Sequence, residues 1–181
     1  MLRGDRIHLR ALEREDLPRM RDWRNLPEFR RHFREFRELN LVNQEQWFAR
    51  ISTSPNDFMF MIERKEDRVP IGVCGLVYTH WVIRSADISL YLGADETYID
   101  GPGGYAEEAA GILIRYAFDN LNLHKVWTEL YSFDSKKVAL FNSLGFARDA
   151  VLRDNCFEDG RYHDSYIYSL IRPDEVREVK P

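Results

Sequence analysis

A glycine-rich turn, Gly101-Pro102-Gly103-Gly104-Tyr105-Ala106, is the part of the sequence whose residue types most clearly allow chemistry. Three of its residues lack a β-carbon, and an apolar stripe at helical spacing follows directly, so the turn leads into the N-terminus of a helix. The first amides of a helix have no partner within the helix, and the helix dipole adds positive potential there. The turn therefore predicts a phosphate site, although a tight structural turn would have the same composition.

Asp87 is the carboxylate best placed to act as a general base. It lies in the strand-like run 86–92, where apolar neighbours would bury it and raise the pKa of its carboxyl. A structural alternative is equally open, in which Asp87 pairs with Arg84 or another cation. Glu107 and Glu108 are weaker candidates, because carboxylates in the first turn of a helix stabilise its dipole whatever the function.

Two kinds of periodicity predict the elements that position these residues. A strand, a helix and a strand follow one another at 86–92, 106–121 and 124–131, which favours parallel, right-handed pairing of the two strands. The expected fold is an α+β single domain with a central mixed sheet flanked by helices. The other expected strands are 6–12, 58–63, 71–78, 150–157 and 161–171. One further helix is expected directly after Asp16, and three more are expected at 28–38, 43–51 and 135–144.

Glycine residues mark two chain reversals between the predicted elements. Asp159-Gly160 predicts a tight hairpin between the last two strands, and Gly145 ends the preceding helix at a position that prefers positive φ. We expect one domain over 1–171, with 172–181 as a C-terminal tail.

Composition argues against several classes of protein. The net charge is −4 with both signs interspersed, and no run approaches the roughly 18 apolar residues of a membrane span, so neither nucleic acid nor a membrane is an expected partner. We expect a cytoplasmic monomer or homodimer that acts on a small-molecule or peptide amine. Cys74 and Cys156 are expected as buried reduced thiols, and the histidine spacing matches no metal site, so no metal is expected.

Several short motifs are distributed along nearly the whole chain, each present once. They are Ile7-His8-Leu9-Arg10 with Glu15-Asp16; Ile71-Gly72-Val73-Cys74-Gly75-Leu76; Ala86-Asp87-Ile88-Ser89-Leu90; Gly104-Tyr105-Ala106-Glu107-Glu108-Ala109; Tyr116-Ala117-Phe118 through Leu121-Asn122-Leu123-His124-Lys125-Val126; Leu144-Gly145-Phe146; and Gly160-Arg161-Tyr162-His163-Asp164. In this order they resemble the GNAT superfamily of N-acetyltransferases, and within it the branch of the ribosomal-protein acetyltransferases.

The resemblance implies a sheet that opens into a V between its two central parallel strands, with acetyl-coenzyme A as the co-substrate. The pantetheine would lie in the V and the pyrophosphate on the glycine-rich turn. The implied contacts are the backbone of Leu90, Tyr91 and Leu92 for the pantetheine, and the amides of Gly103, Gly104, Tyr105 and Ala106 for the pyrophosphate.

The chain departs from the family pattern at the turn and in the helix that follows the second central strand. Pro102 stands where the first glycine of the family would align, and the loop from Gly93 is longer by about four residues. Asp134 and Lys137 occupy positions where the family commonly has an asparagine and a serine. Lys137 could meet a coenzyme phosphate, or it could be a solvated lysine in the first turn of a helix.

Acetyl transfer from a thioester to an amine needs an uncharged nucleophile and a donor for the developing oxyanion. A backbone amide near residues 90–92 is the expected donor, since the V frees one edge of that strand. Many members of the family use a tyrosine as the acid, and Phe141 occupies its position here. We therefore expect Tyr131, Ser132 or water to protonate the thiolate, unless it departs unassisted.

The acceptor side is expected to be built by residues 28–40, by the hairpin 79–85 and by the terminal hairpin. Arginines and phenylalanines alternate in the first of these segments, which would suit a nucleotide-linked amino sugar, although a solvated basic helix face is the open alternative. A protein α-amine is the rival acceptor, and a non-catalytic sensor that binds acyl-coenzyme A is the rival function. The candidate acceptor residues are Arg34, Phe36, His80 and Trp81.

Overall fold

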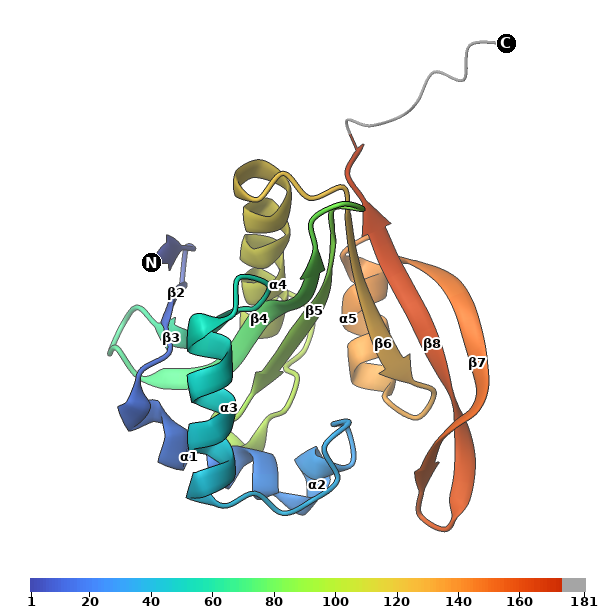
Figure 1. Cartoon of the computed structure of the whole chain (residues 1–181), viewed down its shortest axis with the longest axis horizontal. Helices are drawn as coiled ribbons and strands as arrows, with labels where there is room; N and C mark the ends of the chain where they lie inside the picture. Colours follow the sequence, from blue (N-terminus) through green and yellow to red (C-terminus); the bar gives the residue numbers. More distant parts are fainter. Residues whose placement is uncertain (174–181) are drawn as a thin grey trace.

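Eight strands form one mixed sheet in the order β1-β2-β3-β4-β5-β6-β8-β7, with helices packed against it (Figure 1). This is a computed structural model, and it describes residues 1–173. The strands are β1 Leu2–Arg3, β2 Ile7–Ala11, β3 Phe58–Arg64, β4 Pro70–His80, β5 Ser85–Leu92, β6 Lys125–Tyr131, β7 Ala147–Glu158 and β8 Arg161–Ile171. The helices are α1 Leu17–Asn25, α2 Pro27–Arg30, α3 Leu41–Thr53, α4 Tyr105–Arg115 and α5 Ser135–Ser143, and a π-helical turn, Tyr116–Asn120, continues α4.

The parallel strands β5 and β6 pair at only three positions. These are Ser85 with Lys125, Ala86 with Val126, and Asp87 with Trp127. Every other neighbouring pair in the sheet is antiparallel, and Figure 1 shows β5 and β6 running apart toward their carboxyl ends. The predicted mixed sheet, opened into a V between its central strands, is confirmed.

Helix α4 makes the crossover between β5 and β6. Its predicted apolar stripe is buried and is rich in alanine, with Ala106, Ala109 and Ala110 fully buried. Small side chains let the helix approach the sheet closely, and α4 packs on β2, β4 and β5. In Figure 1, α3 lies in front of the sheet and α4 and α5 lie behind it, so helices cover both faces.

The predicted helix over 28–38 is wrong beyond Arg30. Helix α2 ends there, and bends and turns follow. On a continued helix Arg34 would stand four residues from Arg30 and three from both Arg31 and Arg37, where like charges repel. The guanidinium of Arg34 instead reaches two carboxylates across the V, which the irregular backbone permits.

The predicted helix end at Gly145 and the predicted hairpin turn at Asp159-Gly160 are both confirmed. Gly145 follows α5 with φ of +82°, and Asp159 and Gly160 form the β7–β8 turn with φ of +51° and +76°. Two positive φ values in succession give the turn whose twist matches antiparallel strands.

Cys74 is fully buried, as expected, whereas Cys156 is half-buried, and both are free thiols. Burial raises the pKa of the Cys74 thiol far above its usual range, so it cannot serve as an acyl carrier at neutral pH. Within residues 1–173, none of the helices has the length and apolar character that a membrane crossing requires. Most of the predicted tail, residues 174–181, lies outside the described residues.

Candidate active site

Asp87 lies at the base of the V, in the last residue pair that joins β5 to β6. Its side chain is only 5% exposed, and Arg34 donates to it from Nη2 to Oδ2 at 3.1 Å. Burial raises the pKa of the Asp87 carboxyl to about 6, and the Arg34 guanidinium limits that rise. The Asp87 carboxylate is therefore both buried and paired, and its partner is Arg34 rather than Arg84.

A cavity of about 510 Å³ opens beside Asp87. Its walls come from β5 and β6 beyond the point of separation, from the N-terminal turn of α5, and from the segment α1–α3. Five cationic and five acidic side chains are among those that line it, so net charge alone does not define its ligand. The cationic ones are Arg24, Arg34, Arg37, Arg50 and Lys137, and the acidic ones are Glu35, Asp57, Asp87, Glu129 and Asp134.

Tyr131 lines the same cavity from the end of β6, whereas Ser132 does not. Burial raises the pKa of the Tyr131 hydroxyl to about 12, so the group stays protonated at neutral pH. The amide of Ser132 donates to the carbonyl of Asp164 and holds the chain against the terminal hairpin. Of the two predicted proton donors, only Tyr131 lines the cavity that Asp87 also lines.

The predicted acceptor residues are brought together only in part. Arg34 lines the cavity, but Phe36 is 81% exposed and does not. His80 and Trp81, at the β4–β5 hairpin, are also outside the cavity lining, and the indole of Trp81 donates to Asn56 Oδ1. The segment 31–37 and the helices α1 and α3 form this side of the cavity in place of the hairpin.

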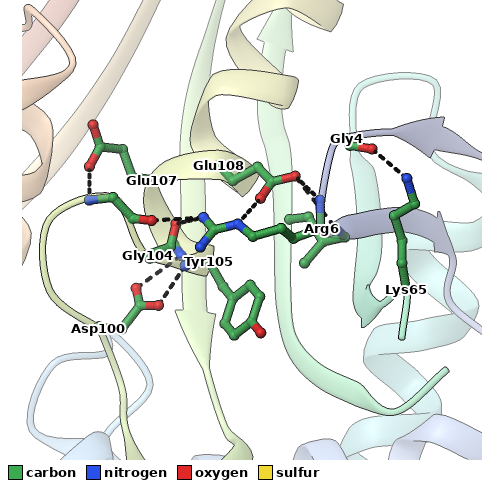
Figure 2. A network of polar contacts seen from close by, with 11 residues as sticks. Gly4, Arg6, Lys65, Asp100, Gly104, Tyr105, Glu107 and Glu108 are labelled. Carbon is green, nitrogen blue, oxygen red and sulfur yellow. Dashed lines mark hydrogen bonds and ion pairs between the residues drawn. The ribbon is translucent and has the colours of Figure 1, made fainter. Parts of the chain in front are cut away.

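The glycine-rich turn binds carboxylates of its own chain. Asp100 accepts from the amide of Tyr105 at 2.5 Å and from that of Ala106 at 3.0 Å, one oxygen for each donor (Figure 2). The amide of Gly103 donates to Glu107 at 2.7 Å, and that of Gly104 to the carbonyl of Gly101 at 3.0 Å. The prediction of unpaired amides is therefore wrong in this structure. The Asp100 carboxylate nevertheless stands where two phosphate oxygens could be held.

Arg6, in the bend just before β2, binds the other side of the turn (Figure 2). Its guanidinium donates to the carbonyls of Gly103 and Gly104 at 2.7 and 3.1 Å and to Glu108 at 2.9 Å. Glu108 also accepts from the Arg6 amide at 2.8 Å. Glu107 and Glu108 thus have structural roles, in agreement with the simpler interpretation of their position.

The longer loop before the turn folds back on the edge of β5. The backbone of Tyr98 exchanges two hydrogen bonds with that of Leu92, at 2.7 and 2.9 Å, on the side of β5 that faces away from β4. The Tyr98 hydroxyl donates to Asp134 at 2.6 Å, and its ring stacks on that of His32 at 4.3 Å. Because backbone groups alternate along a strand, Leu90 presents its amide to the same edge, two residues nearer Asp87.

The remaining candidates lie around the N-terminus of α5. Asp134 caps this helix by accepting from the amide of Lys137 at 3.1 Å. The Lys137 ammonium lies 5.1 Å from the centre of the Tyr98 ring and lines the cavity, so it is not a solvated surface lysine. Phe141 is buried against Phe146 and does not line the cavity.

Three residues of this region could not be recognised from the sequence. Arg24 reads as one charge among several on an amphipathic helix, and Tyr98 and Asp100 belong to a loop without periodicity. The loop folds back on β5 because Asp95, Glu96 and Tyr98 have positive φ. Apart from glycine and asparagine, the residue type does not predict a positive φ. Among residues 1–173, no cluster of three or more potential ligands from His, Cys, Asp and Glu could hold a metal ion.

Comparison with known proteins agrees with this geometry. Residues 6–147 match the family model of the acetyltransferase (GNAT) domain. The uncharacterized N-acetyltransferase p20 of Bacillus licheniformis is 28% identical over 171 residues, which cover 93% of this chain and 94% of p20. A solved spermidine N-acetyltransferase of Vibrio cholerae, in complex with CoA and spermine, has a TM-score of 0.82 at 24% identity and covers 92% of this chain and 95% of that one.

The ribosomal branch is supported less strongly than the superfamily. YdaF of Bacillus subtilis, whose name proposes a ribosomal N-acetyltransferase, is 29% identical over 104 residues, 56% of this chain and 55% of YdaF. The V between β5 and β6 and the match over residues 6–147 show that the chain belongs to the GNAT acetyltransferase family, as an acetyl-CoA-dependent enzyme that acylates an amine.

Proposed function

We propose that the protein transfers an acetyl group from acetyl-CoA to a primary amine by direct attack in a ternary complex at the base of the V. The amine nitrogen forms a bond to the thioester carbonyl carbon, the carbon–sulfur bond breaks, and the amine proton leaves through Asp87. The observation that carries this proposal is the position of Asp87. It is buried at the point where β5 and β6 separate and faces a cavity of about 510 Å³.

Asp87 is the proposed general base. With a pKa of about 6, the carboxyl is ionised at neutral pH yet remains a far stronger base than an exposed aspartate. It can take the proton of the amine directly or through one water molecule. Arg34, at 3.1 Å from Asp87 and 3.4 Å from Glu129, orients the carboxylate and keeps its pKa below neutrality.

The amide of Leu90 is the proposed oxyanion donor. It lies beyond the last paired residue of β5 and β6, and no loop of the described chain folds against it as Tyr98 folds against Leu92. A backbone donor fixed in a strand needs no reorganisation when charge develops on the carbonyl oxygen.

Tyr131 is proposed to assist the departing thiolate by donating a hydrogen bond. A thiol ordinarily has a pKa of about 8.5, so full proton transfer from a hydroxyl with a pKa of about 12 is uphill. A hydrogen bond to the sulfur stabilises the charge without that transfer, and solvent can supply the proton afterwards.

The coenzyme is proposed to follow the edge of β5, with its pyrophosphate on the amides of residues 103–106. Support comes from the Asp100 carboxylate, which already places two anionic oxygens on two of these amides. Phosphate oxygens can take the same donors only after Asp100 has moved away. Coenzyme binding therefore includes a local rearrangement of the loop 93–104.

The acceptor is proposed to be a small molecule or a peptide, with an amino-sugar nucleotide and a protein α-amine as the leading classes. Arg34, Arg24 and the aromatic side chains of the cavity support an acceptor that carries both negative charge and apolar surface. The solved enzyme from Vibrio cholerae binds spermine, which makes a polyamine the comparison substrate.

The test is acceptor-dependent release of coenzyme A thiol. Amino-sugar nucleotides, short peptides and spermidine would each be supplied with acetyl-CoA, with wild-type protein and the variant Asp87→Asn. We expect at least one class to give thiol release that the variant lowers strongly. Tight binding of acetyl-CoA without release for any acceptor would contradict the proposal and favour a binding module.

A further inference from the structure

Two cationic side chains in the cavity, Arg24 and Lys137, have no acidic hydrogen-bond or ion-pair partner among residues 1–173. The Nε of Arg24 is buried without any acceptor. Burial lowers the pKa of both groups. Tyr91 and Glu35 oppose this effect at Arg24, and Asp134 and Asp87 oppose it at Lys137. Both side chains are half-buried, and a cation that is partly withdrawn from water without an acidic partner destabilises a fold. Two such cations at one cavity wall point to a ligand that completes them.

The carboxylates that share the cavity already have partners of their own. Asp134 is the one nearest Lys137 in sequence, but it is occupied by the Tyr98 hydroxyl, the Lys137 amide and His32. The other pairings are Asp57 with Arg50, Glu35 with Arg37, and both Asp87 and Glu129 with Arg34. Among the cationic side chains that line the cavity, Arg24 and Lys137 are therefore the two without a carboxylate partner in the described part of the chain.

One aromatic ring brings the two cations together. The Arg24 guanidinium lies 3.8 Å from the centre of the Phe33 ring, and the Lys137 ammonium lies 5.9 Å from the same centre. A ring face offsets part of the cost of burying a cation, but it leaves the N–H donors unsatisfied. The buried hydroxyl of Tyr91, which also lacks a partner and lines the cavity, adds a further donor near Arg24.

We propose that Arg24 and Lys137 form an anion subsite that binds an acidic group of the acceptor, so the acceptor is an amine that also carries a carboxylate or a phosphate. This inference rests on the proposed acetyl transfer at Asp87, because it places the amine of the same molecule there. Asp87 and the two cations line one continuous cavity. A guanidinium and an ammonium together suit a phosphate or a carboxylate, which accepts from both.

Matched amines test the subsite. Tyrosine and tyramine differ by one carboxylate, and glucosamine 6-phosphate and glucosamine differ by one phosphate. We expect the acidic member of at least one pair to have a kcat/KM at least tenfold higher in the thiol-release assay. The pair with the larger ratio identifies the acid as carboxylate or phosphate. Equal values within both pairs, or a preference for spermidine over all four amines, would overturn the subsite.

Substitutions assign the effect to the two cations. Arg24→Met and Lys137→Met keep much of the apolar stem, and each should bring the acidic-to-neutral ratio of kcat/KM toward one. Arg19→Met on the same helix is the matched control, because Arg19 is exposed and does not line the cavity, and it should keep the ratio. A purely structural Arg24 would instead lower the Tm on substitution and leave the ratio unchanged.

Two further measurements separate this inference from its alternatives. If Lys137→Met raises the KM for acetyl-CoA and leaves the acidic-to-neutral ratio intact, Lys137 serves the coenzyme and the two-cation subsite is wrong. Calorimetric titration of glucosamine 6-phosphate and tyrosine, without coenzyme, tests binding alone. Acid-dependent binding that Arg24→Met removes would support the subsite even if no thiol were released, whereas absence of such binding would overturn it.

Discussion

At the scale of single residues, the site depends on a carboxylate that is both buried and paired. Burial alone would raise the pKa of Asp87 further, and full exposure would leave it near 3.8; the combination with Arg34 gives about 6. A base of that strength is mostly ionised at physiological pH and still accepts a proton readily. Its position in the last β5–β6 pair ties this chemistry to the backbone geometry that opens the V.

Asp87→Asn should abolish the acidic limb of the pH–rate profile. Wild-type kcat/KM should be lost as the pH falls through about 6, because protonation removes the base. In the Asn variant the rate near neutral pH should fall by roughly 10²-fold or more, without an inflection near 6. Glu129→Gln is the control, since it removes the other carboxylate of Arg34 and should keep the inflection. Parallel profiles for wild type and the Asn variant would exclude Asp87 as the base.

Tyr131→Phe should lower kcat with little effect on the KM for acetyl-CoA. The change removes the only atom proposed to contact the departing sulfur, and loss of one such donor typically costs about 10²-fold. Steady-state kinetics at saturating acceptor measure it. Tyr162→Phe, in the exposed β7–β8 hairpin, is the matched control. An unchanged kcat in the Tyr131 variant would mean that the thiolate departs with water alone.

At the scale of elements, the loop 93–104 is the part of the chain that differs most from the expected coenzyme site. Through Tyr98 it occupies the edge of β5 at Leu92, and through Asp100 it occupies the first amides of α4. Gly104 explains part of this arrangement, because a β-carbon there would collide with the Asp100 carboxylate. The glycine thus makes room for an internal anion as well as for a phosphate.

Asp100→Asn should increase the affinity for acetyl-CoA. The wild-type carboxylate competes with the pyrophosphate for the amides of Tyr105 and Ala106, and an uncharged amide competes less well. We expect the Kd to fall by a factor of about 3 to 10, which corresponds to about 1 kcal/mol of charge–dipole interaction. Calorimetry with coenzyme A measures it, with Asp95→Asn in the same loop as the control. A weaker affinity in the Asp100 variant would mean that Asp100 builds the site.

Hydrogen bonds of Arg10 explain why the segments 7–10 and 15–16 form one motif. Arg10 makes two bonds of 2.8 Å to Asp16 and one of 3.0 Å to Glu63, so it connects β2, the turn before α1, and β3. Both carboxylates are buried, with side-chain exposures of 8% and 7%. Because Asp16 directly precedes α1, this network fixes where α1 begins.

Arg10→Met should destabilise the protein by about 3 kcal/mol, because it leaves two buried carboxylates with less compensation. Urea denaturation at pH 7 measures the loss. At pH 4 the loss should be smaller, because burial raises the pKa of the Asp16 carboxyl once Arg10 no longer lowers it, so Asp16 can then be protonated. Arg14→Met, at an exposed ion pair in the adjacent turn, should change stability by less than about 1 kcal/mol. A similar small change for Arg10 would show that the network contributes little.

At the scale of the whole molecule, the sequence was sufficient for the sheet order around the site. The succession of strand, helix and strand at 86–131 allowed the parallel pair to be placed, and the alternation within 58–63 and 71–78 identified the two strands that precede it. Asp87 could be chosen because apolar neighbours on a central strand imply burial. These inferences succeed because periodicity reports directly on which face of an element is buried.

The rest could not be read from the sequence, for physical reasons. The paired amides of the turn depend on Asp100, whose position follows from three positive-φ residues that are not glycine. Arg24 reaches the cavity only because the chain bends after Arg30 and brings Phe33 beneath it. Phe36, His80 and Trp81 lie in the segments predicted to border the acceptor, but orientation of a loop side chain is set by tertiary contacts that spacing does not encode.

A crystal structure of the complex with acetyl-CoA and a non-reactive acceptor analogue would show directly whether the V is the site of acetyl transfer. We expect the pantetheine between β5 and β6, the thioester carbonyl within hydrogen-bond distance of the Leu90 amide and close to Asp87, and Asp100 displaced from the first amides of α4 by the pyrophosphate. Coenzyme bound outside the V, with Tyr98 and Asp100 still in place, would contradict it.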